Sequence, residues 1–211
     1  SARRLWVPVL LIIIISVLRI GAAGSSFRWS RAWNDETVLY TNTLKTFPDA
    51  YTAKANLARC LTNPADQAYA EQLALEAVEA APWYDHGRYV LISIYLNSGR
   101  MEAALEETET ILAEMPTQLY PWSVMGYLSE HLLKDRNAAI EAYGMAQRLS
   151  WQAESESATI NHARLLSLDG KDEEALVILR NARERAPRAR GLNVVYAEFN
   201  RNPDLFRAST Q

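Results

Sequence analysis

The sequence predicts an all-α protein in which one apolar N-terminal helix precedes a solenoid of about four helix-pair repeats. Three observations support this prediction. Pro48, Pro82 and Pro116 follow one another at intervals of 34 residues. Four alanine-rich runs with helical periodicity end at Pro82, Pro116, Trp151 and Pro187. Another helical run precedes each of them. An uncharged apolar stretch of 14 residues, Leu5–Leu18, stands near the N-terminus.

Composition and charge limit the classes of function. The chain of 211 residues has a net charge of −3, so no overall basic field indicates nucleic acid as a partner. Its single cysteine, Cys60, excludes an internal disulfide and a thiolate metal cluster. The charge is uneven: residues 66–114 carry −8 and residues 180–211 carry +4. Solvated helix faces explain this simply, and the alternative is an acidic docking surface with a basic tail that touches acidic lipid or a partner.

The apolar stretch continues through Gly24, which gives 20 residues interrupted only by Arg19. A membrane-spanning helix needs ~20 apolar residues, and an arginine near its end can reach the headgroups. The alternatives are a cleaved signal peptide, with Arg3 and Arg4 before the apolar run, and a buried core helix. We favour a retained anchor with its N-terminus inside, because almost no chain precedes it. The expected anchor residues are Trp6, Leu11, Ile13, Ile15 and Arg19.

The expected organisation follows from these patterns. Residues 1–26 form the transmembrane helix and its flanks, and residues 27–48 form a connecting helix or half-repeat, with Asn34 or Asp35 at its start. Residues 49–189 hold the repeats, at about 51–84, 85–118, 119–153 and 156–189. Residues 190–211 form a capping helix and tail, because the last repeat leaves an open apolar face.

Small residues and turn residues recur at matching places in the four repeats. Small side chains let two paired helices approach closely, which we expect in particular at Gly126. Gly99 and Gly170 are placed to end first helices in a left-handed cap, and prolines to stop second helices. The matching residues are Leu57, Ala58, Ala70, Ala77 and Pro82; Leu91, Tyr95, Gly99, Ala104 and Pro116; Trp122, Gly126, Ala139, Tyr143 and Ala146; and Ala163, Gly170, Ala175, Ala182 and Pro187.

This pattern resembles the tetratricopeptide repeat (TPR) over residues 48–187. The resemblance implies a right-handed α-solenoid whose first helices line a concave groove that binds protein segments. The partner-binding residues it implies are Asn56, Arg59, Tyr89, Ser93, Tyr127, Asn161 and Arg164. His86, Tyr120 and Glu130 occupy further positions that face the groove. Aromatic contacts in the middle, with Arg59 and Arg164 adding positive charge at the two ends, would suit a segment that carries acidic residues.

The junction between the apolar stretch and the repeats resembles a second group. In TMTC-type O-mannosyltransferases and bacterial relatives of the GT-C class, a last membrane helix leads into C-terminal repeats. The residues that carry this resemblance are Arg31, Trp33, Asp35, Leu39, Tyr40, Leu44, Pro48, Asn56 and Leu57. It implies repeats on the non-cytoplasmic side of a membrane. It carries over no transferase residues, because those enzymes need a bundle of membrane helices.

No pattern in the sequence indicates catalysis. His86, His131 and His162 are far apart, and none has a second ligand at helical spacing, so we expect no metal site, no cofactor and no enzyme. The sequence therefore predicts a membrane-anchored, non-catalytic TPR scaffold that binds protein outside the cytoplasm, in the periplasm or an equivalent compartment. Its expected partners are proteins of a membrane complex, and lipid through residues 5–24. The alternatives are an acceptor-positioning domain of a multi-span glycosyltransferase and a structural subunit of a membrane or surface assembly.

Overall fold

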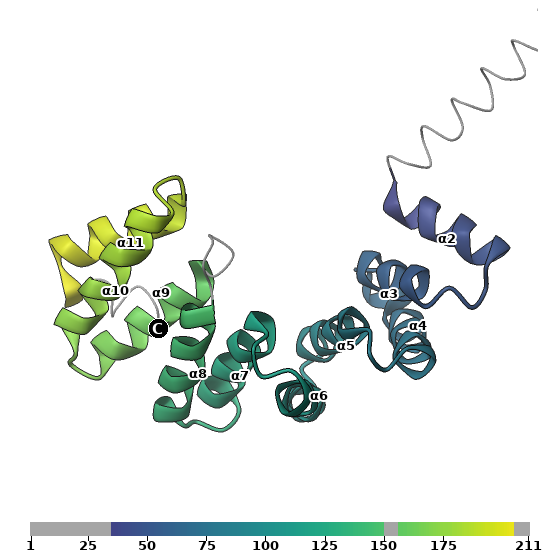
Figure 1. The fold of residues 1–211 in the computed structure, drawn as a ribbon, viewed down its shortest axis with the longest axis horizontal. Coiled ribbons are helices and arrows are strands. Elements are labelled where there is room, and N and C mark those ends of the chain that lie inside the picture. The colour runs from purple at the N-terminus through teal and green to yellow at the C-terminus, as the bar shows by residue number, and fades with distance from the viewer. Residues whose placement is uncertain (1–34, 150–155, 205–211) are drawn as a thin grey trace, which may run out of the picture. The chain divides into compact units, whose positions relative to one another are not determined.

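The computed structural model describes residues 35–149 and 156–204, and all the regular secondary structure in them is helical (Figure 1). The all-α prediction is confirmed. The chain divides into two compact units, residues 1–87 and 88–211, whose boundary falls inside α5. The helices are α2 (Glu36–Thr46), α3 (Tyr51–Cys60), the short 3-10 helix η1 (Pro64–Asp66), α4 (Gln67–Ala80), α5 (Asp85–Asn97), α6 (Met101–Glu114), α7 (Leu119–His131), α8 (Arg136–Leu149), α9 (Glu156–Leu168), α10 (Asp172–Arg185) and α11 (Arg190–Arg201).

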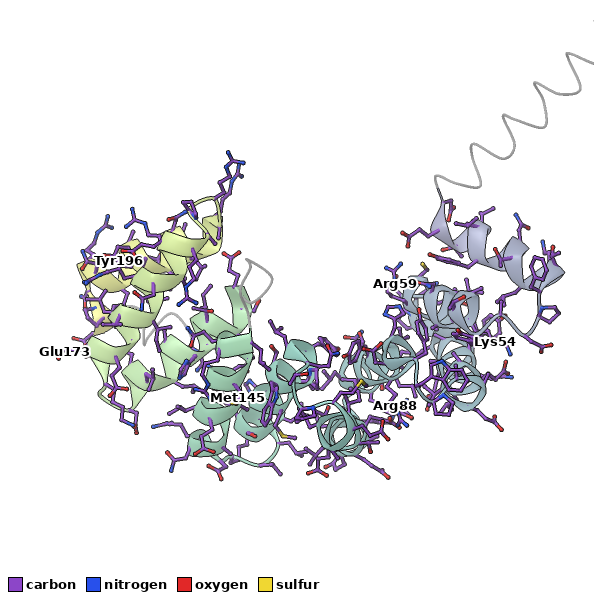
Figure 2. The ribbon with its side chains drawn as sticks, in the orientation of Figure 1. Lys54, Arg59, Arg88, Met145, Glu173 and Tyr196 are labelled. Atoms are coloured by element: carbon purple, nitrogen blue, oxygen red, sulfur yellow. The ribbon has the colours of Figure 1, made fainter. Side chains whose placement is uncertain are left out.

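In the first unit, α3 and α4 form a hairpin built on alanine. The small side chains of Ala58 and Ala77 are at most 2% exposed, so the two helices pack closely. Lys54 of α3, labelled in Figure 2, forms an ion pair across this hairpin with Glu76 of α4, and its Nζ lies 2.8 Å from Oε2 of Glu76. Asp35 caps the N-terminus of α2, and its carboxylate accepts hydrogen bonds from the backbone N–H groups of Thr37 and Val38. α2 packs on α3 but buries no residue of its own.

In the second unit, α6 to α11 pack in chain order, each on the next. Arg88 of α5, labelled in Figure 2, forms an ion pair with Glu107 of α6, and its Nη1 lies 3.0 Å from Oε2 of Glu107. One apolar cluster joins α7, α8 and α9, and a second joins α9, α10 and α11. Leu192 and Phe199 of α11 are 2% exposed, as expected for the inner side of a capping helix. The contacts are therefore mostly between neighbours along the chain, which is the organisation of a repeat protein.

The turns confirm the predicted left-handed caps. Gly99 has a φ of 73° and Gly170 a φ of 77°. In each turn the backbone N–H of the residue after the glycine donates a hydrogen bond to a carbonyl in the last turn of the preceding helix. Arg100 donates to Tyr95 and Lys171 donates to Leu166, both at 2.9 Å. The turn between α7 and α8 has no glycine at this place, and Lys134 takes the positive φ of 57°.

The predicted location as a single-pass membrane protein, with its repeats on the periplasmic or extracytoplasmic side, is wrong. None of the helices in residues 35–149 and 156–204 combines the length and the apolar character that crossing a membrane requires. The α-helices there have 10 to 14 residues, whereas a span needs ~20. The anchor predicted at residues 5–24, from Trp6 to Arg19, lies outside the described residues.

The sequence predicted that two paired helices approach closely at Gly126, and the structure confirms this. Gly126 is buried in α7, and a Cβ added to it would lie 2.7 Å from the ring of Tyr143 on α8. No real Cβ atom stands so close to a neighbour. The hydrogen side chain of Gly126 is therefore what allows the Tyr143 ring to lie flat against α7.

We expect Gly126→Leu to lower the free energy of unfolding by about 1–3 kcal/mol, because the new side chain overpacks the contact with Tyr143. Urea denaturation of the chain measures this change. Combining Gly126→Leu with Tyr143→Leu should recover part of the loss, because the smaller partner makes room. A double variant as unstable as the sum of the two single variants would show that the loss arises elsewhere.

Candidate functional site

The seven predicted partner-binding residues all lie on first helices of hairpins. Asn56 and Arg59 are on α3, Tyr89 and Ser93 on α5, Tyr127 on α7, and Asn161 and Arg164 on α9. In the structure they belong to three groups. Each group lies within one of the two units.

The first group surrounds Arg59 in the first unit. Arg59 is labelled in Figure 2, and its Nη2 lies 2.5 Å from Oε2 of Glu36 at the start of α2. The thiol of Cys60 donates to the same oxygen at 3.3 Å. Both contacts lower the pKa of the Glu36 carboxyl, Arg59 most of all. Arg59 therefore joins α2 to α3.

Asn56 faces a small aromatic cluster in the same unit. The ring of Tyr84 packs edge-on against Tyr51, with centroids 5.3 Å apart, and against His86 at 5.7 Å. Asn56 hydrogen-bonds with Tyr84 and donates its amide to the carbonyl of Thr52 at 2.7 Å. Burial lowers the pKa of His86, and the nearby charge of Arg59 lowers it further. The side chains of this aromatic cluster therefore mostly contact one another.

The second group is a tyrosine pair in the second unit. The rings of Tyr89 on α5 and Tyr120 on α7 have centroids 4.8 Å apart. Both rings are half-buried, and Ser93, one helical turn beyond Tyr89, is exposed. Burial raises the pKa of Tyr120. The pair presents a preformed aromatic surface with an exposed hydroxyl beside it.

The third group, which we call the polar cluster, joins α7, α8 and α9. It consists of Tyr127, Glu130 and His131 of α7, Tyr143 of α8, and Asn161 and Arg164 of α9. Nη2 of Arg164 lies 2.5 Å from Oε2 of Glu130, and Arg164 is 8% exposed. The Tyr127 ring, 37% exposed, rests on His131 with centroids 4.4 Å apart. The predicted residues Tyr127, Asn161 and Arg164 thus come together around a buried ion pair.

Tyr143 links the members of the polar cluster electrostatically. Burial, with the negative charge of Glu130 as the next cause, raises the pKa of Tyr143 to about 12. The positive charge of Arg164 and a hydrogen bond with Asn161 act in the opposite direction. The Tyr143 hydroxyl therefore stays neutral at physiological pH, where it donates and accepts hydrogen bonds but carries no charge. The cluster is suited to holding polar groups in place.

The ion pairs change the expected charge of the groove. The sequence predicted positive charge from Arg59 and Arg164, but each guanidinium is paired with a carboxylate of the chain itself, Glu36 and Glu130 respectively. These two arginines are therefore largely neutralised. What the second unit offers a ligand on its first helices is aromatic and amide surface.

We expect Arg164→Met to destabilise the chain by about 2–4 kcal/mol, because it leaves the half-buried carboxylate of Glu130 without its partner. The double variant Glu130→Leu/Arg164→Met should lie much closer to wild type, since no charge is then left unpaired. Thermal unfolding followed by circular dichroism compares the three proteins. Equal losses in the single and double variants would mean that packing, and not charge, governs this site.

His162 belongs to α9, and its ring packs against α8. It is 9% exposed, and its Nδ1 is buried without a hydrogen-bond partner among the described residues. Its ring packs so tightly on α8 that a Cβ at Gly144 would stand 3.2 Å from its Cε1. Burial lowers the pKa of His162 to about 4, and the charge of Arg148 acts in the same direction. His162 is therefore a neutral core residue at physiological pH.

Stability should fall as the pH drops from about 6.5 towards 4, because the unfolded chain then binds a proton at His162 that the folded chain excludes. The depressed pKa predicts a loss of about 2–3 kcal/mol over this window. The variant His162→Leu should lose correspondingly less. Denaturant unfolding at several pH values tests this. Parallel curves for the two proteins would assign the pH dependence to other groups.

Sequence reasoning missed two partners in these groups. The sequence assigned no contact to Glu36, and it placed Tyr143 only among the residues that match between repeats. A signal for the buried ion pair was present, because Glu130 and Arg164 are 34 residues apart, which is the repeat length. Within the described part of the chain, no three His, Cys, Asp or Glu side chains come together as metal ligands would.

Comparison with solved structures establishes the architecture. A thermophilic TPR protein of Thermus thermophilus matches with a TM-score of 0.63 at 24% identity, over 86% of this chain and 95% of that one. The fold is that of a TPR protein. YrrB, a TPR protein with an unusual peptide-binding site, matches with a TM-score of 0.58 at 17% identity, over 81% and 82% of the two chains. MamA from Desulfovibrio magneticus RS-1, from residue 41 to its end, matches with a TM-score of 0.57 at 15% identity, over 77% and 91%.

These identities are low, and they establish the fold alone. No family model matches the sequence, and no curated protein matches it. The predicted resemblance to TMTC-type glycosyltransferases is not shown by any of these findings. The TPR part of the sequence-based resemblance is confirmed as a fold.

Proposed function

We propose that this chain is a non-catalytic TPR scaffold, and that the first helices of its second unit bind a segment of a partner protein. One observation carries the proposal. The tyrosines Tyr89, Tyr120 and Tyr127 stand partly exposed on the first helices of two consecutive hairpins, α5 and α7. Tyrosine gives a large, rigid contact area with a polar tip, and it is enriched where proteins bind other proteins.

The polar cluster supplies the second part of such a site. The half-buried amide of Asn161 can donate to and accept from the backbone of an extended segment, as can the exposed hydroxyl of Ser93. Because Glu130 neutralises Arg164, the first-helix surface of the second unit has no unpaired positive charge there that would favour an acidic ligand. The proposed ligand is therefore a neutral extended segment whose apolar side chains lie on the tyrosine rings. The fold supports this proposal, since YrrB carries a peptide-binding site on a similar framework.

We expect Tyr89→Ala/Tyr127→Ala to weaken peptide binding at least tenfold, because truncating aromatic residues at the centre of a binding surface costs about 1–2 kcal/mol each. Short random peptides displayed on phage are first selected on the immobilised chain. The affinity of the selected peptides is then measured by fluorescence anisotropy with the wild type and the double variant.

Tyr69→Ala serves as the matched control. Tyr69 is 51% exposed on α4, a second helix of the first unit, so its loss should leave the affinity unchanged. Circular dichroism confirms that all three proteins are folded to the same extent. If the selected peptides bind the double variant as tightly as the wild type, the first-helix surface of the second unit is not the binding site.

A further inference from the structure

A polar cleft lies beside the polar cluster, at the turn between α7 and α8. Its volume is about 620 Å³, and it is formed by the end of α7, the start of α8 and the end of α9. These three helices pack on one another within the second unit (Figure 1). The polar residues that line the cleft are Glu130, His131, Lys134, Arg136, Asn137 and Asp169.

The two carboxylates of this lining already have cationic partners. Oε2 of Glu130 lies 2.5 Å from Nη2 of Arg164. Oδ2 of Asp169 lies 2.6 Å from Nζ of Lys171, and this hydrogen bond lowers the pKa of the Asp169 carboxyl. The negative charges of the cleft are therefore largely neutralised by residues outside its lining.

The two cations of the lining are not paired in this way. Lys134 and Arg136 are exposed, and neither side chain forms an ion pair or a hydrogen bond with another described residue. Arg136 acts on Asp169 only through its charge, and less strongly than Lys171 does. Asp135 stands between the two cations in the sequence, but its carboxylate accepts the backbone N–H of Ala138 at 3.0 Å and does not line the cleft. The cleft therefore has a surplus of positive charge.

The backbone of Lys134 gives a second reason to look for a ligand here. Lys134 has a φ of 57°, whereas glycine takes the positive φ in the turns at Gly99 and Gly170. A residue with a Cβ is less stable than glycine in this left-handed region. Unfavourable backbone conformations of this kind gather at functional sites. The use of lysine in place of glycine supports a role for its side chain.

The charge of the lining indicates the class of the ligand. Lys134 and Arg136 supply two positive charges, and the side chains of Asn137 and His131 can donate further hydrogen bonds. A carboxylate would neutralise only one of the two cations. A phosphate monoester carries about −1.5 to −2 charges at pH 7 and has three strong acceptor oxygens. It matches both the charge and the number of donors.

We propose that this cleft binds a phosphate monoester, carried by a phosphorylated side chain of the partner segment. His131 connects the two sites, because its ring centroid lies 4.4 Å from that of Tyr127 and its side chain also lines the cleft. The segment is neutral where it lies on the tyrosine rings, and its phosphate lies beyond them, at the turn. The inference rests on the proposed function for the source of the phosphate.

The test uses the whole chain and three mixtures of short fluorescein-labelled peptides. Each mixture has random residues on both sides of one fixed residue, which is phosphoserine, serine or glutamate. Fluorescence anisotropy measures the affinities. We expect the phosphoserine mixture to bind at least tenfold more tightly than the serine mixture, a difference of about 1.4 kcal/mol or more. This preference should shrink as salt rises, and the glutamate mixture should lie between the other two.

Variants assign the preference to the cleft. Lys134→Gln/Arg136→Gln should abolish the preference for phosphoserine and leave the affinity for the serine mixture unchanged. Arg180→Gln/Arg185→Gln is the matched control, because it removes the same charge from exposed positions of α10 outside the lining. Tyr89→Ala should weaken binding of all three mixtures by the same factor and keep the preference. A failure of the proposed function is thus seen with Tyr89→Ala, and a failure of this inference with the cleft variant.

Lys134→Gly separates a role in binding from a role in the turn. Glycine takes a positive φ without steric conflict, so the midpoint of thermal unfolding should rise. The preference for phosphoserine should fall in the same variant, because one of the two cations is lost. A preference equal to that of wild type would remove Lys134 from the site.

Inorganic phosphate distinguishes a free ligand from a phosphorylated segment. It should displace the phosphoserine mixture only at much higher concentrations than the unlabelled phosphoserine mixture does. Equal potency would make free phosphate the ligand and overturn the role of the segment. Equal affinities for the glutamate and phosphoserine mixtures would make the ligand a carboxylate. A preference that survives Lys134→Gln/Arg136→Gln would place the phosphate outside the cleft.

Discussion

The close approach of paired helices at small residues is the constraint on which the rest of this structure depends. Ala58, Gly126 and Ala163 are all buried in the second half of a first helix, where a larger side chain would push the second helix away. At Gly126 the distance is so short that even a methyl group would meet the ring of Tyr143. Between α7 and α8 the space left by Gly126 is filled by the ring of Tyr143, which is 2% exposed.

This constraint also decides which charged groups can reach one another. Glu130 and Arg164 stand one repeat apart on first helices that follow each other in the stack, and they meet at 2.5 Å while remaining mostly buried. The pair removes a positive charge from the first-helix surface and leaves tyrosine and asparagine as its main polar features.

Features governed by local chemistry could be predicted from the sequence. Gly99 and Gly170 had to take a positive φ because only a left-handed residue ends a helix in this way, and both do. The open apolar face of the last repeat predicted a capping helix near the C-terminus, and α11 buries Leu192 and Phe199 in the cluster that it shares with α9 and α10. Arg59 and Arg164 have the same residue type and similar repeat positions, but their burial differs greatly. That difference arises from contacts between residues distant in the chain, which spacing alone does not specify.

The lack of any buried residue in α2 has a consequence for the motions of the protein. A helix that buries little apolar surface is separated from its open state by a small free energy, whatever the global stability of the domain. Its link to α3 through Glu36 and Arg59 is solvent-exposed, so ionic strength tunes this local equilibrium. The amide protons of α2 therefore exchange with solvent by local opening, while those of α7 and α8 wait for a larger unfolding event. Raising the salt concentration therefore speeds hydrogen exchange of the α2 amides and changes the exchange of the α7 and α8 amides very little.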